Sequence, residues 1–301
     1  MDNDWVRISA DSSFVTTTAF ALALGAIISV QFGGALAATL IPLIGAPATV
    51  TFRLLLSSVL MMVLVRPSIK GHDPTAWRMV LGLGLTLGAM NFCFYQALAR
   101  LPIGVAVTIE FLGPLLLGAA MSRRVRDGIA VAAALCGVVL ISQALRAGWN
   151  ELDHLGIACA ATAGACWAAY ILFQREVGKH FKGIDGITWA LLLAAIVVTP
   201  LGIIYAHGPL TSPKVVGAGA GVALLSSALP YSMEMMALRT IPPRVFSVLL
   251  ALEPAVAALA GMLVLHQFLT AWQMLGAGLV VTASIIITWR GGRPGAHDTT
   301  G

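Results

Sequence analysis

Long apolar runs alternate with short polar connections along the whole chain. The runs are about 20 residues long, and the connections between them contain prolines, glycines and charged residues. An α-helix of about 20 apolar residues spans the hydrocarbon core of a bilayer. The pattern therefore predicts an all-α integral membrane protein with ten transmembrane helices. The predicted spans are residues 14–33, 43–65, 79–98, 103–121, 128–145, 155–173, 184–205, 215–238, 245–265 and 269–289.

Helix-breaking residues mark the ends of these spans. Proline and glycine interrupt helices, and charged clusters favour the membrane surface. Residues 291–301 are rich in glycine and predict a disordered cytoplasmic tail. The expected breaks are Pro42, residues 66–74, Pro102, Arg123 and Arg124, Gly148, Gly178, residues 208–213, Pro242 and Pro243, and Gln267.

The composition excludes an ordinary soluble fold. Hydrophobic residues make up 58% of the chain, charged residues 10%, and the mean hydropathy is +0.91, whereas soluble proteins have about 45–50% apolar and 25% charged residues. The net charge of +5 comes from short basic clusters between apolar runs, which indicates membrane topology rather than nucleic-acid binding. The four cysteines all lie in apolar runs, so we interpret them as core residues and not as a disulfide framework.

Lysine and arginine are distributed unequally between alternate connections. One set of connections carries fourteen of them and the other set three. Because positive residues are enriched in cytoplasmic loops, the split predicts that both termini are cytoplasmic. The fourteen are Arg7, Arg66, Lys70, Arg78, Arg123, Arg124, Arg126, Arg175, Lys179, Lys182, Arg239, Arg244, Arg290 and Arg293, and the three are Arg100, Arg146 and Lys214.

The two halves of the chain repeat each other. At an offset of 140 residues, Ala97-Leu98, Pro102 and Gly113-Pro114 match Ala237-Leu238, Pro242 and Glu253-Pro254. At an offset of 137, Thr51-Phe52-Arg53 matches Thr188-Trp189-Ala190. The matches predict two units of five helices, residues 1–145 and 146–290. Because five is odd, the second unit must be inverted in the membrane, and inverted repeats are typical of alternating-access transporters.

Apart from Asp185 at the start of its span, four charged residues fall within the predicted spans, namely Arg53, Glu110, Glu234 and Glu253. A charge near the centre of a membrane helix costs about 2.5–3.5 kcal/mol on insertion scales, so each should face the bundle interior or a water-filled cavity. Under the repeat, Glu253 corresponds to Gly113, which lies about one helical turn from Glu110. Both carboxylates are therefore expected to face one central cavity.

This set of charges suits a zwitterionic substrate. Arg53 can hold a carboxylate, while Glu110 or Glu253 can receive an amino group or carry a proton. The alternative is a purely structural ion pair between Arg53 and one of these two carboxylates. Glu234 lies five residues before Arg239, and pairing near the membrane surface is the alternative role for it.

Polar and aromatic residues on the third and eighth spans add candidate substrate contacts. Asn91 and Tyr95 lie one helical turn apart on the third span, and Tyr231 lies on the eighth. Hydrogen bonding between helices is the alternative role for such residues. Trp167, inside the sixth span, is interpreted as core packing.

The sequence carries no signature of other chemistries. It has no glycine-rich phosphate loop and no His or Cys pair at metal-ligand spacing. We therefore expect no metal, no cofactor, no enzymatic activity and no ATP-driven mechanism.

Five segments carry a family resemblance. They are Gly-Ala-Pro at 45–47 followed by Arg53, Ile-Glu-Phe-Leu-Gly-Pro at 109–114, Gly-Ala-Cys-Trp-Ala-Ala-Tyr-Ile-Leu at 164–172, Leu-Pro-Tyr-Ser-Met-Glu-Met at 229–235 and Leu-Glu-Pro at 252–254. Together they resemble the threonine/homoserine exporter branch of the EamA family, in the drug/metabolite transporter superfamily, over about residues 25–285. The chain departs from that branch at His266-Gln267, where such proteins commonly carry Gly-Glu.

The resemblance implies a ten-helix, multi-pass exporter in the inner (plasma) membrane, with functional charges at Arg53, Glu110, Glu234 and Glu253. The leading hypothesis is a proton-coupled antiporter that exports threonine, homoserine or similar amino acids. Its expected partners are the amino acid, protons and the lipid bilayer, with a homodimer as a candidate assembly and no nucleic acid. Efflux of other small metabolites or drugs by the same fold, and a non-transporting membrane subunit, are the alternatives.

Overall fold

The computed structural model describes residues 4–98, 100–101, 103–121, 125–142, 152–206, 208–253, 255–256, 259, 263 and 270–289. Within these ranges every regular element is a helix. The elements are α1 (Asp4–Ile44), α2 (Ala46–Val65), α3 (Pro74–Leu98), α4 (Ile103–Ala120), α5 (Val125–Ser142), α6 (His154–His180), α7 (Asp185–Ile204), α8 (Pro213–Ala223), the π-helical turn η3 (Leu224–Ala228), α9 (Leu229–Leu238), α10 (Pro243–Leu250) and α12 (Ala271–Trp289).

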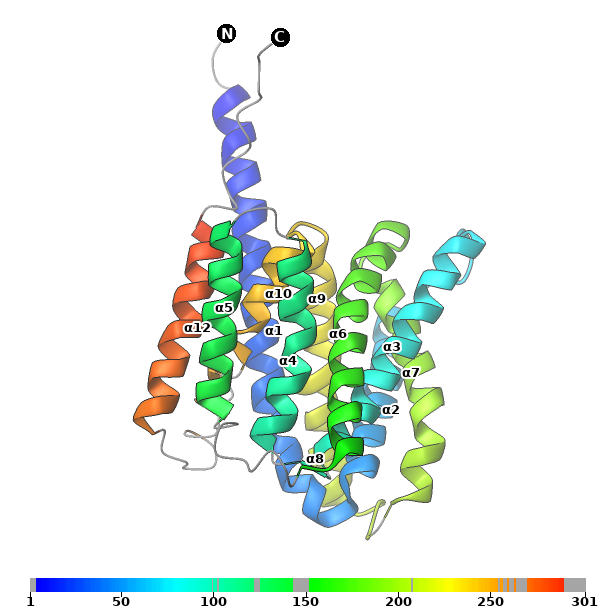
Figure 1. The fold of residues 1–301 in the computed structure, drawn as a ribbon. Helices are drawn as coiled ribbons and strands as arrows, with labels where there is room; N and C mark the ends of the chain where they lie inside the picture. The colour runs from blue at the N-terminus through cyan, green and yellow to red at the C-terminus, as the bar shows by residue number, and fades with distance from the viewer. Residues whose placement is uncertain are drawn as a thin grey trace.

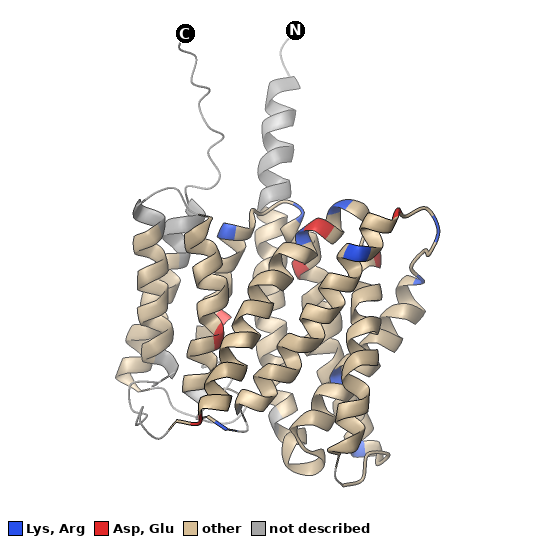
Figure 2. Ribbon diagram, turned by 45° about the vertical axis from the view of Figure 1, so that its right-hand side comes forward, with Lys and Arg blue, Asp and Glu red and all other residues tan. Residues whose placement is uncertain are grey.

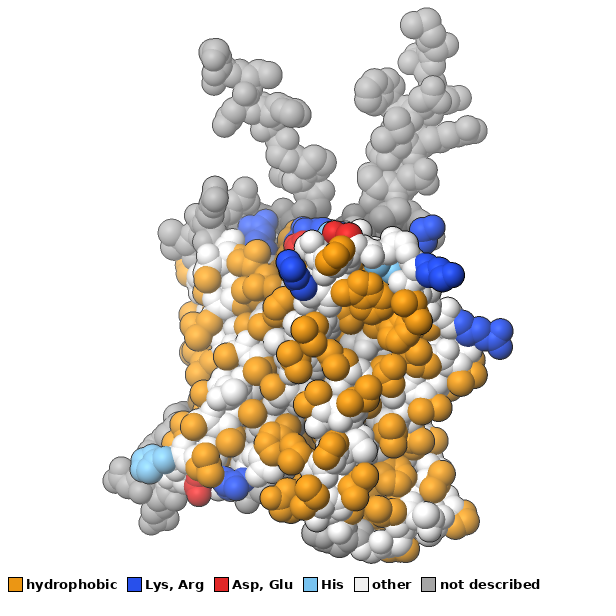
Figure 3. Space-filling model, turned by 90° about the vertical axis from the view of Figure 1, so that its right-hand side faces the viewer, with side chains coloured by type: hydrophobic (Ala, Val, Ile, Leu, Met, Phe, Trp, Pro, Cys, Tyr) orange, Lys and Arg blue, Asp and Glu red, His pale blue; other side chains and the backbone are white. Residues whose placement is uncertain are grey.

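The helices form one bundle, in which they run side by side and alternately up and down (Figure 1). The start of α1 and the end of α12 lie at the same end of this bundle. Apolar side chains cover the side of the bundle, while the charged side chains lie near its two ends (Figure 3). Among the exposed apolar side chains, Leu64 and Ile204 each expose 69% of their surface. An apolar surface of this extent is suited to contact with lipid.

Six helices in the described part of the chain are long and apolar enough to cross a membrane. They are Thr17–Ile44, Ala46–Val65, Pro74–Ala97, His154–His180, Asp185–Ile204 and Pro213–Leu238, with shorter apolar helices at Val105–Ala120, Gly128–Leu140 and Ala271–Ala283. The prediction of an all-helical membrane protein is confirmed in this respect. The count of ten spans stays a prediction.

The first helix is longer than predicted, and the prediction that Pro42 interrupts the chain is wrong. α1 continues past Pro42 to Ile44, and the break falls at Gly45, whose φ of 84° is accessible to glycine at little cost. The next helix then starts with Pro47 in its first turn, where the missing N–H is tolerated.

Two further helices extend beyond their predicted bounds. α6 runs to His180 instead of ending at residue 173, and Gly178, predicted as a break, lies inside it. α3 starts at Pro74 instead of residue 79, because Asp73 caps it. The N–H of Ala76 donates to Asp73 Oδ1 (3.0 Å), and this bond lowers the pKa of the exposed carboxyl.

The eighth and ninth predicted spans are not continuous α-helices. In the eighth, η3 separates α8 from α9, and Leu229 N–H donates to the carbonyl of Leu224, five residues back. This π-helical turn changes which carbonyls remain available for other partners. In the ninth, α10 ends at Leu250, and Glu253 follows a two-residue turn. Both irregularities lie at the centre of the bundle, beside the site described below.

The helices pack in a recurring pattern. α3 contacts α6 and α7, while α1 contacts α8 and α9, and α2 contacts α7 and α8. α5 packs against α12, and α4 packs against α5 and α6. α4 and α6 approach each other closely at two glycines, because a Cβ on Gly113 would overlap the carbonyl of Gly164. Small residues of this kind let membrane helices approach backbone to backbone.

Candidate functional site

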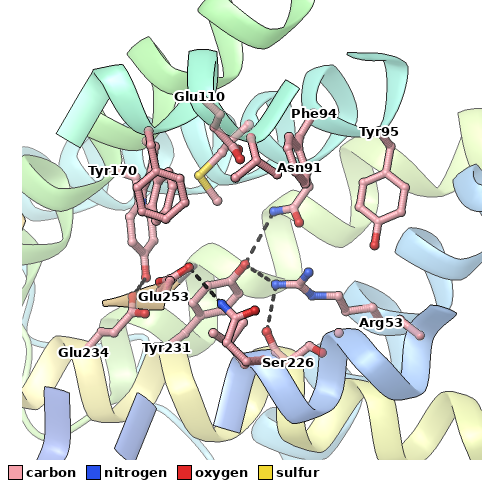
Figure 4. Close-up of a pocket in the computed structure, with 18 of the residues that line it drawn as sticks. Arg53, Asn91, Phe94, Tyr95, Glu110, Tyr170, Ser226, Tyr231, Glu234 and Glu253 are labelled. Atoms are coloured by element: carbon pink, nitrogen blue, oxygen red, sulfur yellow. Dashed lines mark hydrogen bonds between the residues drawn. The ribbon is translucent and has the colours of Figure 1, made fainter. Parts of the chain in front are cut away.

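A cavity of about 380 Å³ lies inside the bundle, with walls from both halves of the chain (Figure 4). Helices α1, α2, α3 and α4 line it from the first half, and α6, η3, α9 and the residue Glu253 from the second. All seven residues predicted for the site line this one cavity. They are Arg53, Asn91, Tyr95, Glu110, Tyr231, Glu234 and Glu253.

Arg53 is fixed by the irregular segment of the eighth span. Its Nε donates to Ser227 Oγ (2.8 Å), and its Nη2 donates to the carbonyl of Ser226 (2.7 Å) and to the hydroxyl of Tyr231 (2.8 Å). Arg53 lies within salt-bridge distance of no carboxylate in the described part of the chain. The alternative of a direct ion pair with Glu110 or Glu253 is therefore wrong for this conformation.

The π-helical turn explains how α2 and α9 are held together. Ser226 lies within η3, so its carbonyl takes part in the altered pattern of that turn and is available to Arg53. The neighbouring carbonyl of Leu225 accepts a hydrogen bond from Ser29 Oγ of α1 (2.7 Å). The turn therefore supplies backbone acceptors to two helices of the first half.

Tyr231 links Arg53 to the third helix. Its hydroxyl accepts the bond from Arg53 and a longer one from Asn91 Nδ2 (3.5 Å), while the other Nδ2 proton of Asn91 goes to the carbonyl of Leu87. The backbone carbonyl of Tyr231 accepts a hydrogen bond from Gln174 Nε2 (3.1 Å). The side chain is 4% exposed, so this set of bonds holds the ring firmly in the wall.

The three carboxylates differ in their partners. Glu234 accepts a hydrogen bond from Tyr170 Oη (2.7 Å), and Glu253 accepts one from Gln31 Nε2 (3.2 Å). Glu110 is 7% exposed and accepts no side-chain hydrogen bond from a described residue. Its carboxylate is therefore the one of the three that still needs a partner, because a buried carboxylate without one is costly.

Glu234 does not pair with Arg239, so the surface-pairing alternative is wrong. Arg239 Nη2 donates instead to the carbonyls of Phe181 and Gly183, in the connection between α6 and α7. Glu234 is 5% exposed and points into the cavity, where it meets Tyr170 (Figure 4).

Sequence reasoning missed several lining residues. Tyr170 lies on the sixth span beside the charged residues, and its polar hydroxyl within an apolar run was an available signal. Trp167, predicted as core packing, is 9% exposed, lines the cavity and packs edge-on against Phe111 (4.8 Å between centroids, 76°). Gln31, Phe94 and Ser226 also line the cavity and were not predicted.

Among the described residues, no group of three or more His, Cys, Asp or Glu side chains is placed to hold a metal ion. His266-Gln267 and the tail 291–301 lie outside the described residues.

Comparison with known proteins decides the family. The model of the EamA-like transporter family matches residues 154–289. Over 271 residues the chain is 37% identical to the threonine/homoserine exporter RhtA of Escherichia coli (strain K12), and the match covers 87% of this chain and 88% of that protein. The chain belongs to the EamA-like transporter family. Among other relatives of this EamA-like chain, RhtA of Salmonella typhimurium (strain LT2) is 37% identical over 85% of this chain and 86% of that protein.

A solved structure has the same fold. A protein of known crystal structure matches this EamA-like chain with a TM-score of 0.68 over 93% of this chain and 97% of the other, at 15% identity. The predicted family resemblance is confirmed by the matches to the RhtA proteins. The transporter names of these relatives agree with the expectation that the chain is not an enzyme. The roles of the seven site residues remain predictions.

Proposed function

We propose that this EamA-like protein is a secondary active transporter that exports small amino acids of the threonine and homoserine type across the inner (plasma) membrane in exchange for protons. The observation that carries the proposal is the central cavity, which both halves of the chain line with one arginine and three carboxylates. Relatives that are 37% identical over most of the chain are named threonine/homoserine exporters.

The proposed mechanism is alternating access between two inverted repeats of five helices, residues 1–145 and 146–290. Asn91 and Tyr231, which hydrogen-bond to each other, are separated by 140 residues, the offset of the repeat. Equivalent residues meet in this way when they lie close to a two-fold axis. The packing of α3 on α6 and of α8 and α9 on α1 has the same relation, and it supports the inverted arrangement.

The proposed orientation places both termini in the cytoplasm. The connections at the end where α1 begins carry most of the described basic residues, and Figure 2 shows lysine and arginine gathered at that end. Positive residues favour the cytoplasmic side. The basic residues at that end whose side chains the structure describes are Arg66, Lys70, Arg78, Arg175, Lys179, Lys182, Arg239 and Arg244, against Arg100 and Lys214 at the other.

The cavity suits a zwitterion of modest size. Its volume of about 380 Å³ lies at the lower end of the range of about 300–1,000 Å³ for small-molecule sites. Arg53 provides positive charge for a carboxylate, and Glu110 provides an unpartnered carboxylate for an ammonium group. Glu234 and Glu253 are the remaining groups that can take up and release protons, as coupling to a proton gradient requires.

Flux into everted vesicles tests the proposal. Vesicles containing the protein, with an acidic lumen, are expected to accumulate labelled threonine or homoserine, and a protonophore should abolish the accumulation. Vesicles without the protein are the control. Absence of proton-dependent flux for every amino acid tested would sink the proposed function.

A further inference from the structure

The hydroxyl of Tyr231 is surrounded by donors. Arg53 Nη2 (2.8 Å) and Asn91 Nδ2 (3.5 Å) both donate to its oxygen, so the acceptor side of the hydroxyl is occupied. Its own proton goes to no acceptor among the described residues. Because a buried hydroxyl usually satisfies its donor, an acceptor from outside the protein fits this position.

The guanidinium of Arg53 presents its remaining donors to the same space. Its Nε and Nη2 are used by Ser227, Ser226 and Tyr231. The third nitrogen, Nη1, points toward the side of the cavity where Asn91 and Tyr95 lie (Figure 4). This part of the wall therefore offers N–H and O–H donors and a positive charge, and the ligand group that matches it is an anion.

We infer that the Tyr231 hydroxyl donates directly to the carboxylate of the transported amino acid, with Arg53 as the positive charge behind it. The inference rests on the proposed function and adds a specificity-determining contact. Arg53 alone would attract any anion, whereas the fixed hydroxyl demands an acceptor at one position. The site then rejects compounds in which the carboxylate is replaced by an amide, because the amide carries no negative charge and adds donors where donors already lie.

The test compares threonine with threoninamide as inhibitors of labelled homoserine flux in proteoliposomes. Loss of a hydrogen bond to a charged group weakens binding by about tenfold or more. In the wild type we therefore expect threonine to inhibit at a concentration about tenfold or more below that of threoninamide. In Tyr231→Phe, which keeps the ring beside Tyr170, the inhibition constant for threonine should rise by about tenfold. The inhibition constant for threoninamide should rise less, because a hydrogen bond to a neutral amide oxygen is weaker than one to a carboxylate.

The control is Tyr205→Phe, which removes a hydroxyl at the end of α7, outside the cavity, where the side chain is 53% exposed. It should keep the wild-type preference. Equal losses for acid and amide in Tyr231→Phe would overturn the inference, since the hydroxyl proton would then serve the protein itself.

If Tyr231→Phe does not reach the membrane, the comparison of threonine and threoninamide in the wild-type protein still tests the inference. Equal inhibition by threonine and threoninamide in the wild type overturns the inference while leaving amino-acid transport intact. Absence of homoserine flux above that of protein-free liposomes overturns the proposed function and the inference with it.

Discussion

Adding one methyl group between α4 and α6 should displace Glu110. In the structure, a Cβ on Gly164 would lie 2.6 Å from the carbonyl oxygen of Glu110, whereas ordinary contact begins at 3.4 Å. Gly164→Ala therefore forces the two backbones apart by about 0.8 Å at the turn that carries Glu110. Functional groups need to stay within about 0.5 Å of their working position, so the displacement exceeds what the site tolerates.

The magnitude follows from a comparison of two alanine variants. Gly278→Ala, in the middle of α12, meets nothing within 4 Å and gains only the better helix propensity of alanine, about 1 kcal/mol. Gly164→Ala has the same gain but adds the cost of an overpacked contact, about 1–3 kcal/mol. We expect Gly164→Ala to be less stable than Gly278→Ala by about 1–3 kcal/mol and its threonine flux to fall by about tenfold or more.

The free energy of unfolding is measured by titration with sodium dodecyl sulfate in mixed micelles, followed by tryptophan fluorescence, to which Trp167 contributes from the affected helix. Initial rates of threonine flux in proteoliposomes provide the second measurement. If Gly164→Ala matched Gly278→Ala in stability and transported at the wild-type rate, the backbone contact between α4 and α6 would be refuted.

Three further predictions concern charged residues. Arg53→Lys keeps the charge but cannot make the three hydrogen bonds of the guanidinium, so the initial rate of homoserine flux should fall by about tenfold; a wild-type rate would contradict this. Glu234→Gln and Glu253→Gln should each reduce the response of flux to an imposed pH gradient, and if both variants fold and keep wild-type coupling, the assignment of proton exchange to these two carboxylates is wrong. Asp73→Ala removes the cap of α3. Folding lowers the pKa of the Asp73 carboxyl, so the stabilisation that this carboxylate provides is present above about pH 4. It is lost as the pH falls through the lowered pKa of the folded state. Thermal unfolding midpoints of wild type and variant should therefore differ at pH 6 and converge in acid, whereas a difference that does not vary with pH would contradict the cap.

The sequence pattern placed some of the helices closely, but it did not place their irregularities. Twenty apolar residues fix a span because the bilayer demands them, so α2 and α7 begin and end within three residues of their predicted bounds. The predicted break at Pro42 was wrong because neighbouring helices can accommodate a proline within a membrane helix. The π-helical turn at Leu224–Ala228 carries no local sequence signal of this kind, since its carbonyls are stabilised by Ser29 and Arg53, which lie far away in the chain.

The charged residues of the site could be predicted from the sequence, because burying a charge in a membrane helix costs free energy. Arg53, Glu110, Glu234 and Glu253 stood out because an isolated charge inside an apolar run needs a reason, and the structure brings them to one cavity. Tyr170 was not predicted although its hydroxyl in an apolar run was a signal, because a tyrosine in a membrane helix is common and its bond to Glu234 is visible only in the structure. Partner choice of this kind depends on helix packing, which the sequence pattern does not contain.

Arg53 also makes the two halves unequal. Its counterpart under the proposed repeat is Ala190, a fully buried residue on α7 that makes no such bonds. A carrier built from two identical inverted halves would spend equal time open to each side of the membrane, because exchanging the halves exchanges the two states. Under the proposed symmetry, the bonds between Arg53 and the π-helical turn have no equivalent in the other half. Each 1.4 kcal/mol by which they favour one state would change the ratio of the two populations about tenfold. We therefore expect the empty carrier to have a preferred resting side, set by a single asymmetric arginine.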